Sequence, residues 1–137
     1  AGYYGPNIQQ EGACGDDDVY DPNYLEQVIS TLGGAPVSWE SRTQSVGVPG
    51  LFGEEPTVMK QAAEALSEAK AEGADLIVSA CNLSQAVLDI YQGKAGRNTG
   101  LSTNIPVIHL CEMLSFALGC HNKRLALLRT RIAVIGD

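Results

Sequence analysis

Short apolar runs alternate with amphipathic stretches along most of the chain. Residues 75–80 form the clearest run, which is aliphatic and β-branched until its end, as expected of a central strand buried on both faces. Further strands are predicted at residues 2–5, 35–39, 105–110 and 131–136, the last of them at an edge. Because these runs alternate with helical stretches, the pattern predicts an α/β fold in three layers, with a mostly parallel sheet of four to five strands and helices on both faces.

The amphipathic stretches predict four helices. They cover residues 22–32, 56–72, 83–90 and 111–118. Asp21 is expected to cap the first helix, with Pro22 at its first position, and Asn82 to cap the third, with Gln85 as its capping-box partner.

Two further local patterns give expectations about side chains and loops. Leu83, Val87 and Ile90 are predicted to form the apolar face of the third helix. Residues 93–104 are rich in glycine, asparagine and threonine, which predicts a surface loop. The glycines of residues 47–53 lack the spacing of a phosphate-binding loop, so we expect flexibility there and no nucleotide.

Composition narrows the class of protein. The chain has 137 residues, 45% of them hydrophobic, so we expect residues 1–137 to form a single domain. The net charge of −7, without a lysine- or arginine-rich run, argues against a nucleic-acid partner. No apolar stretch approaches the roughly 18 residues of a membrane span, and the first residues lack the layout of a signal peptide. We therefore expect a cytoplasmic protein whose four cysteines are thiols.

Cys81 is the first candidate for chemistry. It directly follows the predicted central strand and precedes a helix, at the sheet edge where open parallel sheets bind their ligands. Helix N–H groups there could favour a reactive thiolate, and Ser84 completes a C-x-x-S layout on the first turn. The alternative interpretation is a small buried residue that fills space at the strand end. The sequence leaves both open.

The remaining candidate ligands do not form a recognisable metal site. Cys111 and Cys120 lie in an apolar stretch, which favours a core role, and Cys14 is expected to be exposed. The three aspartates at residues 16–18 lack the alternating spacing of a calcium loop. His109 and His121 have no C-x-x-C pair beside them, so we predict no metal site.

Several short motifs keep one order along nearly the whole chain. They are Tyr3-Tyr4-Gly5, Asp21-Pro22, Leu32-Gly33, Val37-Ser38-Trp39, Gly73-Ala74-Asp75, Leu88-Asp89-Ile90-Tyr91-Gln92, Ile105-Pro106-Val107 and Ala117-Leu118-Gly119. In order and spacing they resemble the cysteine-rich CCG domain found in the B-type subunit of heterodisulfide reductase. Such proteins usually carry two of these domains in tandem, and this chain resembles the second one.

The resemblance implies a site, because five cysteines of that family bind a noncubane iron–sulfur cluster. The matching positions in this sequence are Pro6, Ser45, Val46, Cys81 and Ser84. Only Cys81 keeps a thiol, whereas proline and valine offer no side-chain donor. We therefore expect no cofactor in this chain, and a noncubane [4Fe-4S] cluster only if ligands at other positions complete it.

Three hypotheses follow. In the first, the chain is a component of a cytoplasmic heterodisulfide-reductase-like oxidoreductase, an electron-transfer complex in which it supplies structure or a docking surface for other protein subunits or for further copies of itself. In the second, it is a thiol-dependent enzyme or a small-ligand-binding domain that uses Cys81 in the former cluster pocket. In the third, Cys81 and Cys14 contribute to a new metal site. Whether the chain is itself an enzyme is left open; it is at most one component of such an oxidoreductase.

Overall fold

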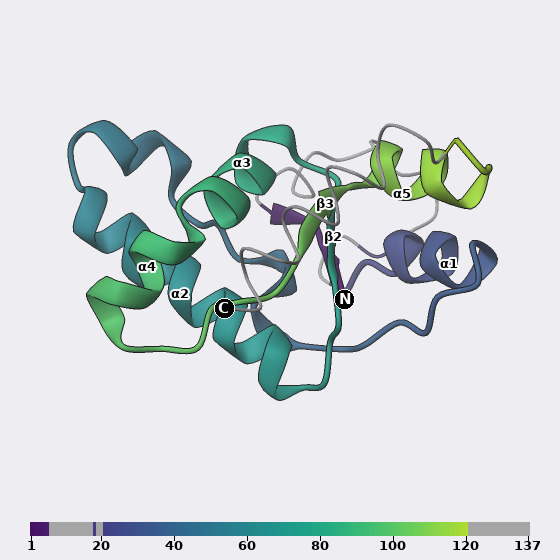
Figure 1. Cartoon of the computed structure of the whole chain (residues 1–137), viewed down its shortest axis with the longest axis horizontal. Helices are drawn as coiled ribbons and strands as arrows, with labels where there is room; N and C mark the ends of the chain where they lie inside the picture. The colour runs from purple at the N-terminus through teal and green to yellow at the C-terminus, as the bar shows by residue number, and fades with distance from the viewer. Residues whose placement is uncertain (6–17, 19–20, 121–137) are drawn as a thin grey trace.

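A three-stranded parallel sheet forms the centre of the molecule (Figure 1). The computed structural model describes residues 1–5, 18 and 21–120. Its strands are β1 (Gly2–Tyr3), β2 (Ile77–Ser79) and β3 (Val107–His109), in the order β1-β2-β3. The predicted α/β class and parallel sheet are confirmed. Of the four to five strands predicted, the described residues contain three, and the strand predicted at residues 131–136 lies outside them.

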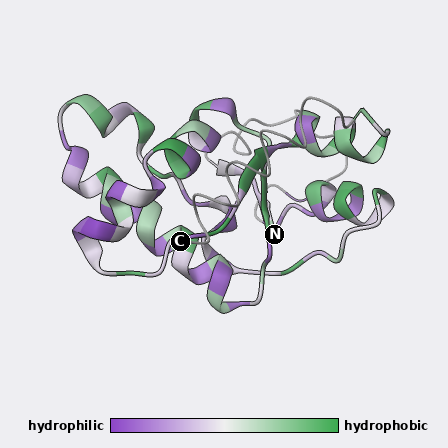
Figure 2. Cartoon of the chain, in the orientation of Figure 1, coloured by the Kyte–Doolittle hydropathy of each residue, from purple (hydrophilic) through white to green (hydrophobic). Residues whose placement is uncertain are grey.

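Helices cover both faces of the sheet, so the predicted three layers are confirmed (Figure 1). One face carries Tyr3, Ile77 and Val107, which pack against three helices. These helices are α2 (Glu55–Ala71), α3 (Asn82–Ile90) and α4 (Gln92–Thr99). The opposite face carries Val78 and Ile108, beside α1 (Tyr24–Thr31) and α5 (Leu110–Ala117). Figure 2 shows hydrophobic segments in β2 and β3, between helices of mixed character.

Helix α2 closely follows its predicted bounds and face. Its buried stripe includes Val58, Ala62, Leu66 and Ala69, as the helical period requires. The helix ends before Gly73, which adopts a φ of 84° that favours glycine. Small alanines on the buried stripe allow α4 to pack closely against α2.

Helix α1 begins two residues later than the capping pattern predicts. Asn23, not Asp21, is its N-cap, and Pro22 lies outside the helix. The reason is tertiary, because Arg42 binds the Asp21 carboxylate and donates a hydrogen bond of 2.8 Å from Nη1 to the Pro22 carbonyl. These bonds hold Asp21 and Pro22 outside the path of the helix.

The capping box predicted for α3 is wrong, and of its predicted apolar face only Val87 is confirmed. Cys81 is the N-cap, Asn82 is already helical, and no side-chain cap bond forms. The buried face consists of Ser84, Val87 and Leu88, whereas Leu83 and Ile90 are 66% and 71% exposed. Docking on the sheet therefore turns Ser84 inward, where the sequence pattern placed Leu83.

The loop predicted at residues 93–104 is wrong for its first part, since α4 occupies residues up to Thr99, whereas residues 100–104 belong to no helix or strand. The Gln92 side chain donates a buried hydrogen bond of 2.6 Å to the Ile105 carbonyl, and Ala95 is fully buried. A Cβ on Gly96 would lie 2.6 Å from Thr103 Oγ1, so glycine is needed here for close approach and not for a turn. The chain leaves the helix at Gly100, which has a φ of 75°.

Residues 35–39 form no strand, so the strand predicted there is wrong. Trp39 instead docks on β1 through its side chain, with Nε1 donating a hydrogen bond of 2.9 Å to the Gly2 carbonyl. Two 3-10 turns follow, η2 (Glu40–Thr43) and η3 (Val48–Phe52), so the glycine-containing segment 47–53 is largely a defined turn.

Candidate functional site

The carboxyl ends of β1 and β2 meet the first turn of α3. After β1 the chain turns at Gly5, whose φ of 68° favours glycine. A Cβ on Gly5 would lie 3.1 Å from Ser84 Oγ and 3.8 Å from the Cys81 Cβ, so this backbone passes directly over the start of α3. Together with Tyr3 and Val46 these residues form what we call the carboxyl-edge site.

Tyr3 is the centre of the carboxyl-edge site. Its side chain is buried, its hydroxyl donates a hydrogen bond of 2.6 Å to the Gln44 carbonyl, and its oxygen also hydrogen-bonds with Ser84 and the Val46 backbone. Its ring centroid lies 5.8 Å from that of Trp39. Burial raises the pKa of Tyr3 to about 12, so the phenol is protonated at neutral pH.

Cys81 is held at the N-cap of α3 by a buried hydroxyl. The Cys81 N–H donates to Ser79 Oγ at 3.2 Å, and Ser79 Oγ donates to the Cys81 carbonyl at 3.1 Å. Cys81 is only 9% exposed. Both interpretations of this residue are compatible with this geometry, so a reactive thiolate at Cys81 stays a prediction.

The structure brings together three of the five positions that match cluster ligands in the family. Val46, Cys81 and Ser84 are buried around Tyr3. Ser45 is exposed, and its hydroxyl accepts a hydrogen bond of 3.1 Å from the Gly47 N–H. Pro6 lies outside the described residues, directly after Gly5.

This donor set does not fit an iron–sulfur cluster. The three buried positions offer one thiol, one hydroxyl and one hydrocarbon side chain, whereas such clusters are held by several thiolates. Within residues 1–5, 18 and 21–120, no group of three or more His, Cys, Asp or Glu side chains could hold a metal ion. Cys14, which the third hypothesis needs, lies outside that range.

The core role predicted for Cys111 and Cys120 is wrong, since both are exposed. Helix α5 packs on the sheet through Leu110 and Met113, which leaves Cys111 on its outer side. His109 serves as its N-cap, because its Nδ1 accepts a hydrogen bond of 3.2 Å from the Cys111 N–H. His121 lies outside the described residues.

Two residues that sequence reasoning missed organise this end of the molecule. Tyr3 was expected only to belong to a strand, although an aromatic residue at a strand end is a signal for a pocket wall. Arg42 had no local signal at all. It binds Asp21, donates a hydrogen bond of 2.9 Å from Nη1 to Glu26, and lies 5.6 Å from the centroid of the Tyr4 ring.

Comparison with known proteins supports part of the resemblance to the B-type subunit of heterodisulfide reductase. The chain is 30% identical over 126 residues to the 8-methylmenaquinol:fumarate reductase membrane anchor subunit of Wolinella succinogenes, covering 91% of this chain and 44% of that protein. It is 25% identical over 113 residues to an Archaeoglobus profundus protein that is named for its likeness to the B-type subunit of heterodisulfide reductase, covering 81% of this chain and 38% of that protein. No protein-family model matches the chain.

The chain is therefore distantly homologous to subunits of oxidoreductase complexes. It spans less than half the length of either relative. Among the described residues, no helix has both the length and the apolar character needed to cross a bilayer.

Proposed function

We propose that this chain is a component of a cytoplasmic heterodisulfide-reductase-like oxidoreductase, in which the domain has a structural or docking role and binds no iron–sulfur cluster of its own. The observation that carries the proposal is the carboxyl-edge site. It gathers Val46, Cys81 and Ser84 around a buried tyrosine, but retains one thiol among the positions that match cluster ligands. Homology to subunits of oxidoreductase complexes supports the partner class, which is other protein subunits or further copies of the chain.

The metal content of the chain tests this proposal. Protein made and purified without oxygen is expected to be folded, colourless and substoichiometric in both iron and acid-labile sulfide, because one thiolate cannot hold a cluster. Iron and sulfide assays with visible absorption spectra provide the measurement. A Cys81→Ser variant prepared in parallel separates metal held at this site from metal bound elsewhere. Stoichiometric iron and sulfide with charge-transfer absorption would contradict the proposal.

A second candidate function is a thiol-dependent enzyme or small-ligand-binding domain. The position of Cys81 favours it, since the thiol lies at the N-terminus of α3 beside the buried hydroxyls of Ser84 and Tyr3. The two candidates differ in what they require of Cys81. Catalysis needs a thiolate that reagents can reach, whereas a structural residue needs only to be buried.

Alkylation rates separate the two candidates. In a variant with Cys14, Cys111 and Cys120 replaced by serine, Cys81 is expected to react with iodoacetamide more slowly than free cysteine, because it is buried. A matched variant that retains only Cys111, which is exposed, is expected to react at close to the rate of free cysteine. If Cys81 instead reacted faster than free cysteine at neutral pH, the second candidate would be favoured.

A further inference from the structure

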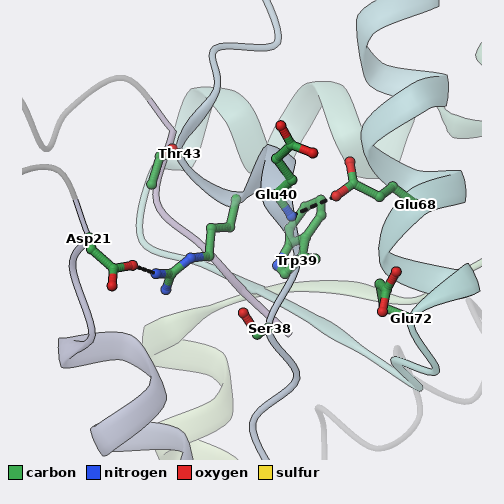
Figure 3. A pocket seen from close by; sticks show the side chains of 8 residues that line it. Asp21, Ser38, Trp39, Glu40, Thr43, Glu68 and Glu72 are labelled. Carbon is green, nitrogen blue, oxygen red and sulfur yellow. Dashed lines mark hydrogen bonds and ion pairs between the residues drawn. The ribbon is translucent and has the colours of Figure 1, made fainter.

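A groove with a volume of about 610 Å³ lies outside the carboxyl-edge site. It is bounded by the segment before α1, the segment around η2 and the C-terminal end of α2 (Figure 3). We call it the Trp39 groove. Its lining residues are Asp21, Ser38, Trp39, Glu40, Arg42, Thr43, Glu68 and Glu72. This volume falls in the range of roughly 300–1,000 Å³ that is usual for ligand pockets.

At one end of the Trp39 groove the cation is already paired. Arg42 binds Asp21 and Glu26, and its Nη1 also donates to the Pro22 carbonyl. The guanidinium therefore has two carboxylate partners from the α1 segment, and its charge does not neutralise the rest of the groove. In Figure 3, Asp21 lies on one side of Trp39, and Glu68 and Glu72 lie on the other.

The other end is acidic, and no cation among the described residues pairs with its carboxylates. Within the part of the chain that the structure describes, no lysine or arginine forms an ion pair with Glu40, Glu68 or Glu72. Glu72 is also the C-cap of α2, where the helix dipole adds negative potential and carboxylates are unfavourable for the helix itself. The Glu72 carboxylate therefore adds to the negative field of the groove without stabilising α2.

The wall of this acidic end is preorganised. The Glu68 carboxylate accepts hydrogen bonds from the Glu40 N–H at 2.6 Å, from the Ser41 N–H at 3.2 Å and from the Ser41 hydroxyl, so η2 holds it in one orientation. Trp39 is buried and fixed by its bond to Gly2, so its indole forms a rigid aromatic wall. A carboxylate held in place beside an aromatic ring suits ammonium and guanidinium groups.

We propose that the Trp39 groove is the place where a partner protein docks a basic segment, with lysine or arginine side chains placed among Glu40, Glu68 and Glu72. This inference rests on the docking role proposed above and names its surface. A metal ion is disfavoured, because the described residues contain no metal-binding group of His, Cys, Asp or Glu. An anionic partner is disfavoured by the four carboxylates that line the groove. Electrostatic complementarity of this kind sets partner choice and association rate.

Trp39 provides the readout, since it is the single tryptophan of the chain and lines the groove. The probe is an acetylated peptide of alternating arginine and glycine, titrated into the full chain at physiological ionic strength. Tryptophan fluorescence is expected to change and to saturate. In a Glu40→Lys/Glu72→Lys variant, affinity is expected to fall by about tenfold or more.

A matched variant controls for general charge attraction. Glu54→Lys/Glu64→Lys makes the same change in net charge at exposed positions that do not line the groove, and it is expected to weaken binding by less than about threefold. Equal weakening in both variants, or no change in Trp39 fluorescence, would overturn the proposal. Spermine binding as tightly as the peptide would overturn the choice of a protein segment as occupant. These results are independent of the iron content, so a failure here is distinguishable from a failure of the proposed function.

Discussion

Replacing Arg42 with alanine is expected to destabilise the domain by about 2–4 kcal/mol, which is large for a single surface-proximal residue. The Arg42 side chain is only 13% exposed and its partner Glu26 is 17% exposed. Removal of the guanidinium would leave the Glu26 carboxylate largely buried beside the Tyr4 hydroxyl without its cation, and the Pro22 carbonyl without its donor. Urea unfolding of the two proteins at neutral pH provides the measurement.

The control for this prediction is an ion pair that lies fully at the surface. Lys60 and Glu64 are 3.8 Å apart on α2, with side chains 69% and 54% exposed, so Lys60→Ala is expected to cost less than about 0.5 kcal/mol. Equal losses for Arg42→Ala and Lys60→Ala would show that Arg42 does not link η2 to α1 as its contacts indicate.

Alkaline pH is expected to destabilise the domain through Tyr3. Burial, the main cause, raises its pKa in the folded state from 10 to about 12. The folded protein therefore keeps a proton that the unfolded chain loses. Stability is complete below pH 10 and falls as the pH rises toward 12, by about 2–3 kcal/mol for this group. Burial also raises the pKa of Tyr4, followed by its hydrogen bond to Glu26, which acts in the same direction.

Urea unfolding between pH 8 and pH 12 measures this effect. A Tyr3→Phe variant should be less stable at pH 8 by about 1 kcal/mol, because the bond to the Gln44 carbonyl is lost, but its stability should fall less steeply above pH 10. Tyr91, which is not part of the carboxyl-edge site, offers a control through Tyr91→Phe. A Tyr3→Phe variant with the same pH profile as the original chain would contradict the assignment.

Both predictions concern the same end of the molecule, and this bears on function. Arg42 joins η2 to the segment before α1, while Tyr3 joins β1 to the segment that carries Val46. The carboxyl-edge site and the Trp39 groove are neighbours, because the ring of Tyr3 in the first contacts the ring of Trp39 in the second. Substitutions of Arg42 or Tyr3 are expected to affect both the carboxyl-edge site and the Trp39 groove. Functional tests should therefore use the exposed carboxylates of the groove instead.

The fold class was predictable because its signals are local. Burial could be predicted from the pattern of apolar residues alone for the run at residues 75–80 and for the apolar stripe of α2. The structure confirms both. The presence of one thiol among the five positions that the resemblance matches to cluster ligands was likewise visible in the sequence, since it depends only on residue type. The order of motifs also indicated relatives among oxidoreductase subunits, and similarity to known proteins supports that class.

The wrong predictions are those in which local composition competes with contacts to residues farther along the chain. Glycine, asparagine and threonine in residues 93–104 suggested a loop, but Gly96 is required where Thr103 passes close to α4. Asp21 had the chemistry of a helix cap, but Arg42 binds it. In each case a partner at least seven residues away decides the outcome, and a short window cannot contain it.

By itself, then, the sequence determined the layered α/β class, the main helix α2, and the presence of a single thiol among the five family positions. Only the tertiary structure decided that Ser84 faces inward, that Tyr3 occupies the centre of the carboxyl-edge site, and that four carboxylates line one groove. The physical reason is that periodicity and residue type act over a few residues. The contacts that build these sites join segments about 20 to 80 residues apart, and they form only when the sheet and its helices pack.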